Sequence, residues 1–163
     1  MSGVVIEISA LEAAHLADIV AQFVELLTDT DPSDVGGDPA IARLVPDAYR
    51  DDADAAAEFR RFTQSDLLER RRAEGAEVAR TLRDAGAAER VSDLEDRDAT
   101  AMQVISLDDA QVDAWLRTIT AIRLVLAVRL GIHDDTDDLS HPRFGIYTWL
   151  GYRLEGLLDA MEG

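Results

Sequence analysis

The stretch from residue 108 to residue 131 constrains the fold most, because apolar side chains occupy almost every face of the helix it predicts. The side chains that point inward on almost any rotation are Trp115, Leu116, Ile119, Ile122, Val125, Leu126 and Leu130, with Leu124 and Val128 covering much of what remains. A helix that is apolar all round is buried among other elements. Gly131 is expected to end it. The sequence therefore predicts a mainly α fold: a single-domain helical bundle over residues 1–163, built around this central buried helix.

Three arginines exclude this apolar helix as a membrane span: Arg117, Arg123 and Arg129. Each would cost about 2.5–3.5 kcal/mol at the centre of a bilayer. The N-terminal segment also lacks the basic residues that begin a secretory signal. We therefore expect no membrane partner and a cytoplasmic location.

Two short stretches rich in β-branched residues predict a minor two-stranded β element. Residues 4–8 read VVIEI, and residues 101–107 read AMQVISL. Neither has another obvious mate, and an unpaired strand edge is a liability, so we expect the two to pair. Ser106, near the end of the second strand, is expected to cap the central helix.

Capping and helix-breaking residues predict the flanking helices. Ser9 and Glu12 form a Ser-x-x-Glu capping box that opens an amphipathic helix. A pair of helices is expected over roughly residues 51–85, separated at Ser65, which would serve as the N-cap of the second. The last helix is expected to follow Pro142.

The charge of the chain restricts its partners. The sequence has 33 acidic and 16 basic residues, for a formal net charge of -17. Such a surface repels DNA, RNA and anionic lipid. It suits a basic protein partner, because opposite charge speeds association and selects the partner.

Motifs for catalysis are missing from the sequence. There is no cysteine, which excludes disulfides, thiolate metal ligands and cysteine nucleophiles. Serine-hydrolase elbows, phosphate loops and dinucleotide fingerprints are absent too. His15 has no legible acid–base partner and is interpreted as structural. We expect no enzymatic activity and no cofactor. Acidic pairs from distant helices leave a metal-dependent or acid/base enzyme open as an alternative.

The densest polar stretch is GIHDDTDDLSHP, residues 131–142, where His133 and His141 bracket four aspartates. A calcium loop of the EF-hand type fails because Leu139 falls on a required position in both possible registers. A zinc site would need two histidines eight residues apart, with no regular element to hold them. The stretch therefore predicts a solvated acidic turn between two helices, with no metal.

The only locally basic stretch covers residues 58–72. Its arginines are Arg60, Arg61, Arg70, Arg71 and Arg72. One interpretation is a helix pair that binds DNA directly, in the manner of a helix-turn-helix, or offers these arginines to a partner. The other is a solvated helical face whose arginines balance a very acidic molecule. The second is favoured, because the local excess is two charges against strong global repulsion.

Arg123 is the most informative single charge. It lies between Ile122 and Leu124, so its stem is expected to be buried. A buried guanidinium needs a partner, which is most often a carboxylate. Glu58, an acid in an apolar context, is the predicted partner in a structural ion pair.

Three blocks together resemble a known family: AYRDDADAAAEFRRFTQSDL (48–67), WLRTITAIRLVLAVRLGI (115–132) and YTWLGYRLEGLLDAM (147–161). The resemblance is to an actinomycete family catalogued as a domain of unknown function. Its genes lie near that of the ClpS protease adaptor, and some members are described as AosR-type oxidative-stress transcription regulators. It spans nearly the whole chain, and its motifs are structural rather than catalytic.

This chain departs from the family pattern in two ways. Thr120 and Ala121 replace an Asn-Asp pair, which removes polar groups from the central helix. The resemblance also implies redox regulation through a cysteine pair, and this chain has no cysteine, so a thiol switch cannot operate.

The resemblance implies a non-enzymatic cytoplasmic regulatory or protein-interaction domain. Such a domain would regulate transcription through a protein partner such as a sigma factor. A homo-oligomer stays open, because Trp149 and Tyr152 on the last helix could supply aromatic contacts, although core packing is the favoured role of Trp149.

Overall fold

A computed structural model describes residues 3–45, 53–133 and 138–163, and for residues 32–34 and 53–61 it describes the backbone alone. The elements in chain order are β1 (Val4–Ser9), α1 (Ala10–Asp29), α2 (Pro39–Ala42), α3 (Ala53–Asp84), β2 (Met102–Leu107), α4 (Asp109–Leu130) and α5 (Gly145–Glu162). The structure confirms the predicted mainly α fold with a minor two-stranded β element.

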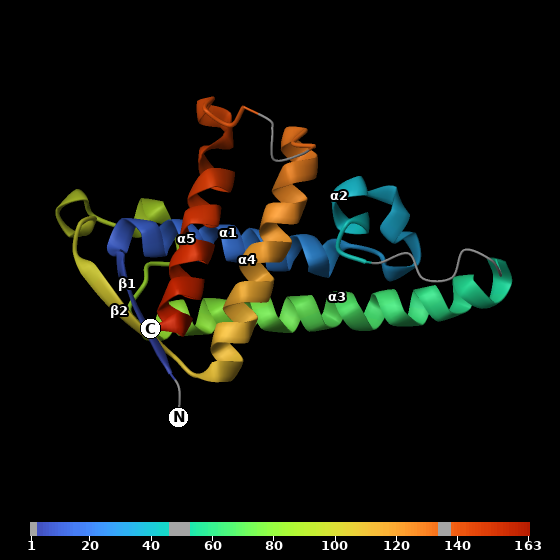
Figure 1. Ribbon diagram of the computed structural model, residues 1–163, viewed down its shortest axis with the longest axis horizontal. Coiled ribbons are helices and arrows are strands. Elements are labelled where there is room, and N and C mark those ends of the chain that lie inside the picture. The colour runs from blue at the N-terminus through green and yellow to red at the C-terminus, as the bar shows by residue number, and fades with distance from the viewer. Residues whose placement is uncertain (1–2, 46–52, 134–137) are drawn as a thin grey trace.

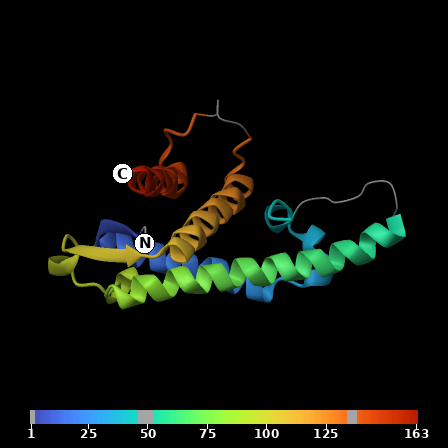
Figure 2. The same cartoon turned by 60° about the horizontal axis from the view of Figure 1, so that its bottom comes forward.

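The helices form two layers, α1 with α3 and α4 with α5. α1 and α3 run side by side in one layer, and α4 crosses them (Figure 1). α5 packs against α4 on the side away from α3, and the sheet lies near the C-terminal end of α3 (Figure 2). α4 therefore packs against α1 and α3 on one side and against α5 on the other. This is the central position that its apolar surface predicts.

α4 begins one residue later than expected. Its N-cap is Asp108, which shares a capping box with Gln111: the Gln111 N–H donates to the Asp108 carboxylate over 2.8 Å. The prediction of Ser106 as the cap is wrong, because Ser106 is still in β2, paired with Val5. The other end is as predicted. Gly131 adopts φ +72°, a left-handed conformation that suits glycine, and ends the helix.

α3 is one helix of 32 residues, so the predicted break at Ser65 is wrong. Gly75 lies inside α3 and faces α1. A Cβ at this position would lie 2.8 Å from Cγ2 of Val24 on α1. The contact explains the glycine: packing against α1 offsets the roughly 1 kcal/mol that glycine costs a helix interior.

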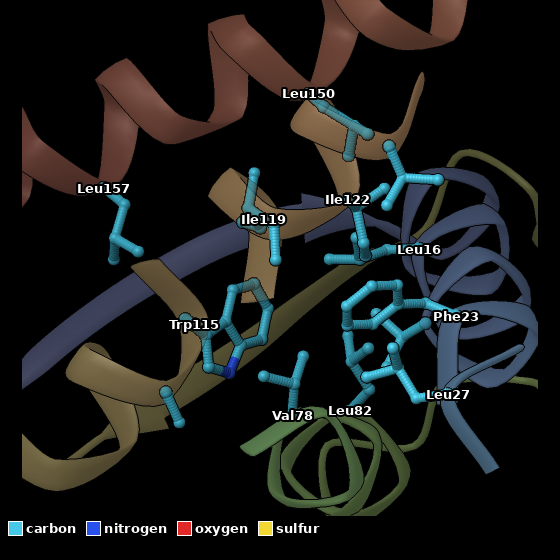
Figure 3. Close-up of a cluster of buried hydrophobic side chains, with 14 of the residues drawn as sticks. Leu16, Phe23, Leu27, Val78, Leu82, Trp115, Ile119, Ile122, Leu150 and Leu157 are labelled. Carbon is cyan, nitrogen blue, oxygen red and sulfur yellow. The ribbon is translucent and has the colours of Figure 1, made fainter. Parts of the chain in front are cut away.

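The core lies where α1, α3, α4 and α5 meet (Figure 3). Its labelled side chains are Leu16, Phe23 and Leu27 of α1, Val78 and Leu82 of α3, Trp115, Ile119 and Ile122 of α4, and Leu150 and Leu157 of α5. The indole N–H of Trp115 donates to Oγ1 of the buried Thr81 over 2.9 Å. Because the hydrogen bond satisfies the polar atom of the indole, Trp115 can be almost fully buried.

β1 and β2 pair with each other, as predicted, and the pairing is antiparallel. Alternate residues point to opposite faces of the pair. The inner face joins the core through Val4, Ile8, Ile105 and Leu107. The outer face is solvent-exposed. In the described residues, no helix combines the length and the apolar character needed to cross a bilayer.

Candidate interaction surface

Arg123 is half-buried on α4 and held by α5. Its Nε–H donates to the backbone carbonyl oxygen of Tyr147 over 3.2 Å, and its guanidinium carbon lies 4.0 Å from the centre of the Tyr147 ring. Gly151 makes room for it, because a Cβ there would lie 2.8 Å from Nη2 of Arg123. A carbonyl and an aromatic face therefore meet the guanidinium. The side chain of Glu58 lies outside the described residues, so its pairing with Arg123 stays a prediction.

In the basic stretch of α3, each arginine whose side chain is described forms an ion pair with a nearby acid of the same helix. Arg70 lies 3.2 Å from Asp66, Arg71 lies 3.3 Å from Glu74, and Arg72 is paired with Glu69. Each pair joins residues three or four apart on the same helix. The side chains of Arg60 and Arg61 lie outside the described residues. Between residues 62 and 72, the described part offers no run of unpaired arginines to a phosphate backbone.

The predicted acidic turn falls partly outside the described residues, since Asp134, Asp135 and Asp137 are not among them. His141 has a structural role: its Nδ1 accepts the N–H of Arg143 over 3.1 Å and caps a short 3₁₀ turn. Arg143 in turn donates to the carbonyl oxygen of Leu130 over 3.0 Å. Within the described parts of the chain, no three His, Asp or Glu side chains are grouped to hold a metal.

A junction that the sequence did not reveal forms around Glu12, in the capping box of α1. Glu12 accepts the indole N–H of Trp149 over 3.0 Å and a hydrogen bond from Arg153, both on α5. It also receives the backbone N–H of Ser9. We call Glu12, Trp149 and Arg153 the α1–α5 junction. Since Trp149 and Arg153 are four residues apart, they share a face of α5, but nothing local in the sequence identifies their acceptor.

The environment of Glu12 favours its charged form. The hydrogen bond from Arg153 lowers the pKa of Glu12 to about 2, against a smaller opposing effect of burial and with further help from Trp149. Glu12 is therefore an ionised carboxylate at neutral pH whose contacts hold α5 onto the start of α1. Each of its two carboxylate oxygens accepts a hydrogen bond from α5.

The outer face of the sheet carries exposed apolar side chains. Val5, Met102 and Val104 are 62%, 60% and 55% exposed. Glu7 is paired with Val104 across the two strands and adds a negative charge to the same face. We call these four residues the outer sheet face. Exposed apolar groups gathered on one face are typical of a contact surface.

Aromatic residues of α5 divide between core and surface. Trp149 packs against the core, as favoured by the sequence, while donating to Glu12. Tyr152 is 67% exposed, near Arg153. Of the two aromatic residues considered for partner contacts, Tyr152 is therefore exposed and Trp149 is partly buried.

Comparisons with known proteins give a family and distant relatives. The model of the family described as "Domain of unknown function (DUF2017)" matches residues 1–161. Similar proteins include the "Oxidative stress regulator AosR" of Mycobacterium tuberculosis strain H37Rv and that of Mycobacterium bovis. Each is 25% identical over an alignment 188 residues long, which covers 93% of this chain and 79% of the relative. No solved structure matches.

Proposed function

Because this chain belongs to the family described as a domain of unknown function, DUF2017, and is similar over nearly its whole length to a protein named as an oxidative stress regulator, we propose that it is a non-enzymatic regulator of transcription that acts through a protein partner. The observation that carries the proposal is the match to that regulator over 93% of this chain.

The charge of the chain supports a partner of stated chemistry. A formal charge of -17 favours a basic protein, and a sigma factor of RNA polymerase is the class that the family resemblance suggests. The same charge opposes direct contact with nucleic acid. Since the chain has no cysteine, thiol oxidation cannot control the association.

The outer sheet face is the proposed contact surface. Its apolar side chains would be buried by a partner, and Glu7 would meet a basic group. Apolar residues at the centre with charge at the edge are the usual composition of a protein interface.

The test is affinity capture from native lysate, with the recovered proteins identified and the binding repeated with the purified candidate. Wild type is compared with Val104→Glu and with Phe62→Glu, a control that adds the same charge at a 78% exposed position on α3. We expect wild type and the control to recover a sigma factor or another transcription protein, and Val104→Glu to lose it. If no transcription protein is recovered by wild type, the proposal is wrong.

Two further measurements address the other classes of function. A mobility-shift titration that showed a sequence-selective affinity falling steeply with salt would assign the function to direct DNA binding through residues 58–72. Stoichiometric zinc or calcium in the purified protein would contradict a metal-free, non-enzymatic role.

A further inference from the structure

A hollow of about 200 Å³ lies between α3, α4 and the residues that follow α2. Its lining includes Leu44 after α2, Arg71 of α3, and Leu116, Arg117, Thr120 and Leu124 of α4. The volume equals that of roughly seven water molecules, at about 30 Å³ each. α2 and the sheet lie near opposite ends of α3, so the hollow is separate from the outer sheet face (Figure 1). We call it the α3–α4 hollow.

The groups of the lining that would meet a ligand are open to solvent. The Arg117 side chain is 56% exposed, and the Arg71 side chain is 25% exposed. Thr120 is exposed as well, and Leu116 and Leu124 are half-buried. The lining therefore presents two cationic groups and two apolar groups that a dissolved small molecule can touch directly.

Arg71 and Arg117 share one carboxylate. Nη1 of Arg71 donates to Oε2 of Glu74 over 3.3 Å. Nη1 of Arg117 lies 3.6 Å from Oε1 of Glu74, an oxygen that accepts no hydrogen bond within the described residues. Two guanidinium groups beside one carboxylate leave an excess of one positive charge among these three side chains. None of the described residues of the lining is acidic. The hollow is therefore a local cationic site on a chain whose net charge is -17.

The two kinds of lining group select an apolar anion. A guanidinium presents its N–H groups in a planar fork that matches the two oxygens of a carboxylate. Leu116 and Leu124 would cover a short hydrocarbon chain, and the burial of that chain favours binding. A single negative charge fits best, because it balances the excess at the hollow and each further charge adds repulsion from the rest of the acidic chain.

We propose that the α3–α4 hollow binds a short aliphatic monocarboxylate. Its oxygens accept hydrogen bonds from Arg117 and Arg71, while its hydrocarbon chain lies against Leu116 and Leu124. The inference does not depend on the proposed regulatory function. It concerns a different part of the molecule from the outer sheet face, so the two proposals can fail separately.

The experiment titrates the full chain with three probes at constant ionic strength. The first, 4-methylpentanoate, has both the charge and the hydrocarbon chain; 4-methylpentanamide has the chain without the charge, and acetate has the charge without the chain. Nuclear magnetic resonance follows the methyl groups of Leu116, Thr120 and Leu124. We expect saturable shifts with 4-methylpentanoate, binding at least about five-fold weaker for the amide, and binding at least about ten-fold weaker for acetate. Absence of a saturable shift, or equal binding of either control probe, would overturn the proposal.

Charge variants locate the carboxylate. Arg117→Gln removes the more exposed of the two cations, and we expect it to weaken binding of 4-methylpentanoate by at least about five-fold. Arg70→Gln is the matched control, because it removes the same charge from α3 at a position outside the lining, and it should bind as wild type does. Unchanged binding by Arg117→Gln would contradict the proposal. An equal loss in both variants would contradict it too, since binding would then follow the overall charge.

Variants of Thr120 test the hollow at an exposed position, where substitution has little effect on stability. Thr120→Asp places a negative charge in the lining and should weaken binding by at least about five-fold through repulsion. Thr120→Asn introduces a side chain of nearly the same size without the charge, and should keep the affinity within about two-fold of wild type. Circular dichroism verifies that each variant is folded. If Thr120→Asp binds the acid as well as Thr120→Asn does, the acid binds elsewhere and the proposal is wrong.

Discussion

Two regions of the molecule pair arginine with carboxylate, and they differ in how far apart the partners are in the chain. On α3, Arg70 and Arg72 pair with acids one helical turn away, on an exposed surface. At the α1–α5 junction, Arg153 pairs with Glu12, which lies 141 residues earlier in the chain, and both side chains are partly buried. The α3 pairs form wherever the helix forms. The junction pair forms only when α5 reaches α1, so it contributes to the tertiary structure.

The largest effect is expected from breaking the junction. Glu12→Ala removes the acceptor of Trp149 and Arg153 together with half of the capping box. We expect a loss of about 2–3 kcal/mol in the free energy of unfolding, from the cap and from partly buried donors left unpaired. Chemical denaturation measures it. Glu69→Ala, which breaks an exposed pair on α3, is the control, and an equal loss in the two variants would contradict the comparison.

The pH dependence of stability sharpens the same comparison. The pKa of Glu12 is lowered from 4.5 to about 2, chiefly by Arg153. A depressed carboxyl pKa stabilises the folded state above the unfolded pKa, and that stability is lost as the pH falls toward the folded pKa. We expect the Glu12 contribution to be complete above about pH 4.5 and to disappear toward pH 2. Denaturation at a series of pH values should show a shallower acid loss in Glu12→Gln than in wild type. Identical slopes would show that Glu12 does not control the acid limb.

Arg123 provides an intermediate case, since it joins α4 to α5 through a carbonyl and a ring. Arg123→Leu should lower the free energy of unfolding by about 1–2 kcal/mol, because a hydrogen bond and a cation–π contact are lost. Glu58→Ala should cause a comparable loss if the predicted ion pair exists. Thermal melts show both effects. If Glu58→Ala melts at the wild-type temperature, Glu58 is not the partner of Arg123. If Arg123→Leu melts at the wild-type temperature, the contact of Arg123 with Tyr147 does not stabilise the fold.

The smallest effects are expected on the exposed face of α3. Arg70→Ala and Arg72→Ala each break a pair between residues on one helix. Exposed pairs of this kind contribute about 0.3–0.5 kcal/mol. Denaturation midpoints should therefore stay close to the wild-type value, and the difference should shrink further in high salt. A loss above 1 kcal/mol would mean that these arginines hold more than their helical neighbours.

Features with local causes were predictable. The capping box at Ser9 and the stop at Gly131 depend on residues within a few positions, and both are present. The buried central helix followed from its apolar surface. One error arose where a local capping signal was not used. Ser65 could have capped a helix, but α3 continues through it, and its close contact with α1 at Gly75 is one that no local signal shows.

The sequence by itself determined the central helix, the helices on either side of it in outline, the strand pair and the strongly acidic net charge, because periodicity, capping and composition need no knowledge of the fold. Only the tertiary structure decided that Glu12 accepts hydrogen bonds from Trp149 and Arg153, that Tyr147 receives Arg123, and that a hollow opens between α3 and α4. These features join residues far apart in the chain. Their distances depend on how the packed helices cross, and a linear pattern does not encode that geometry residue by residue.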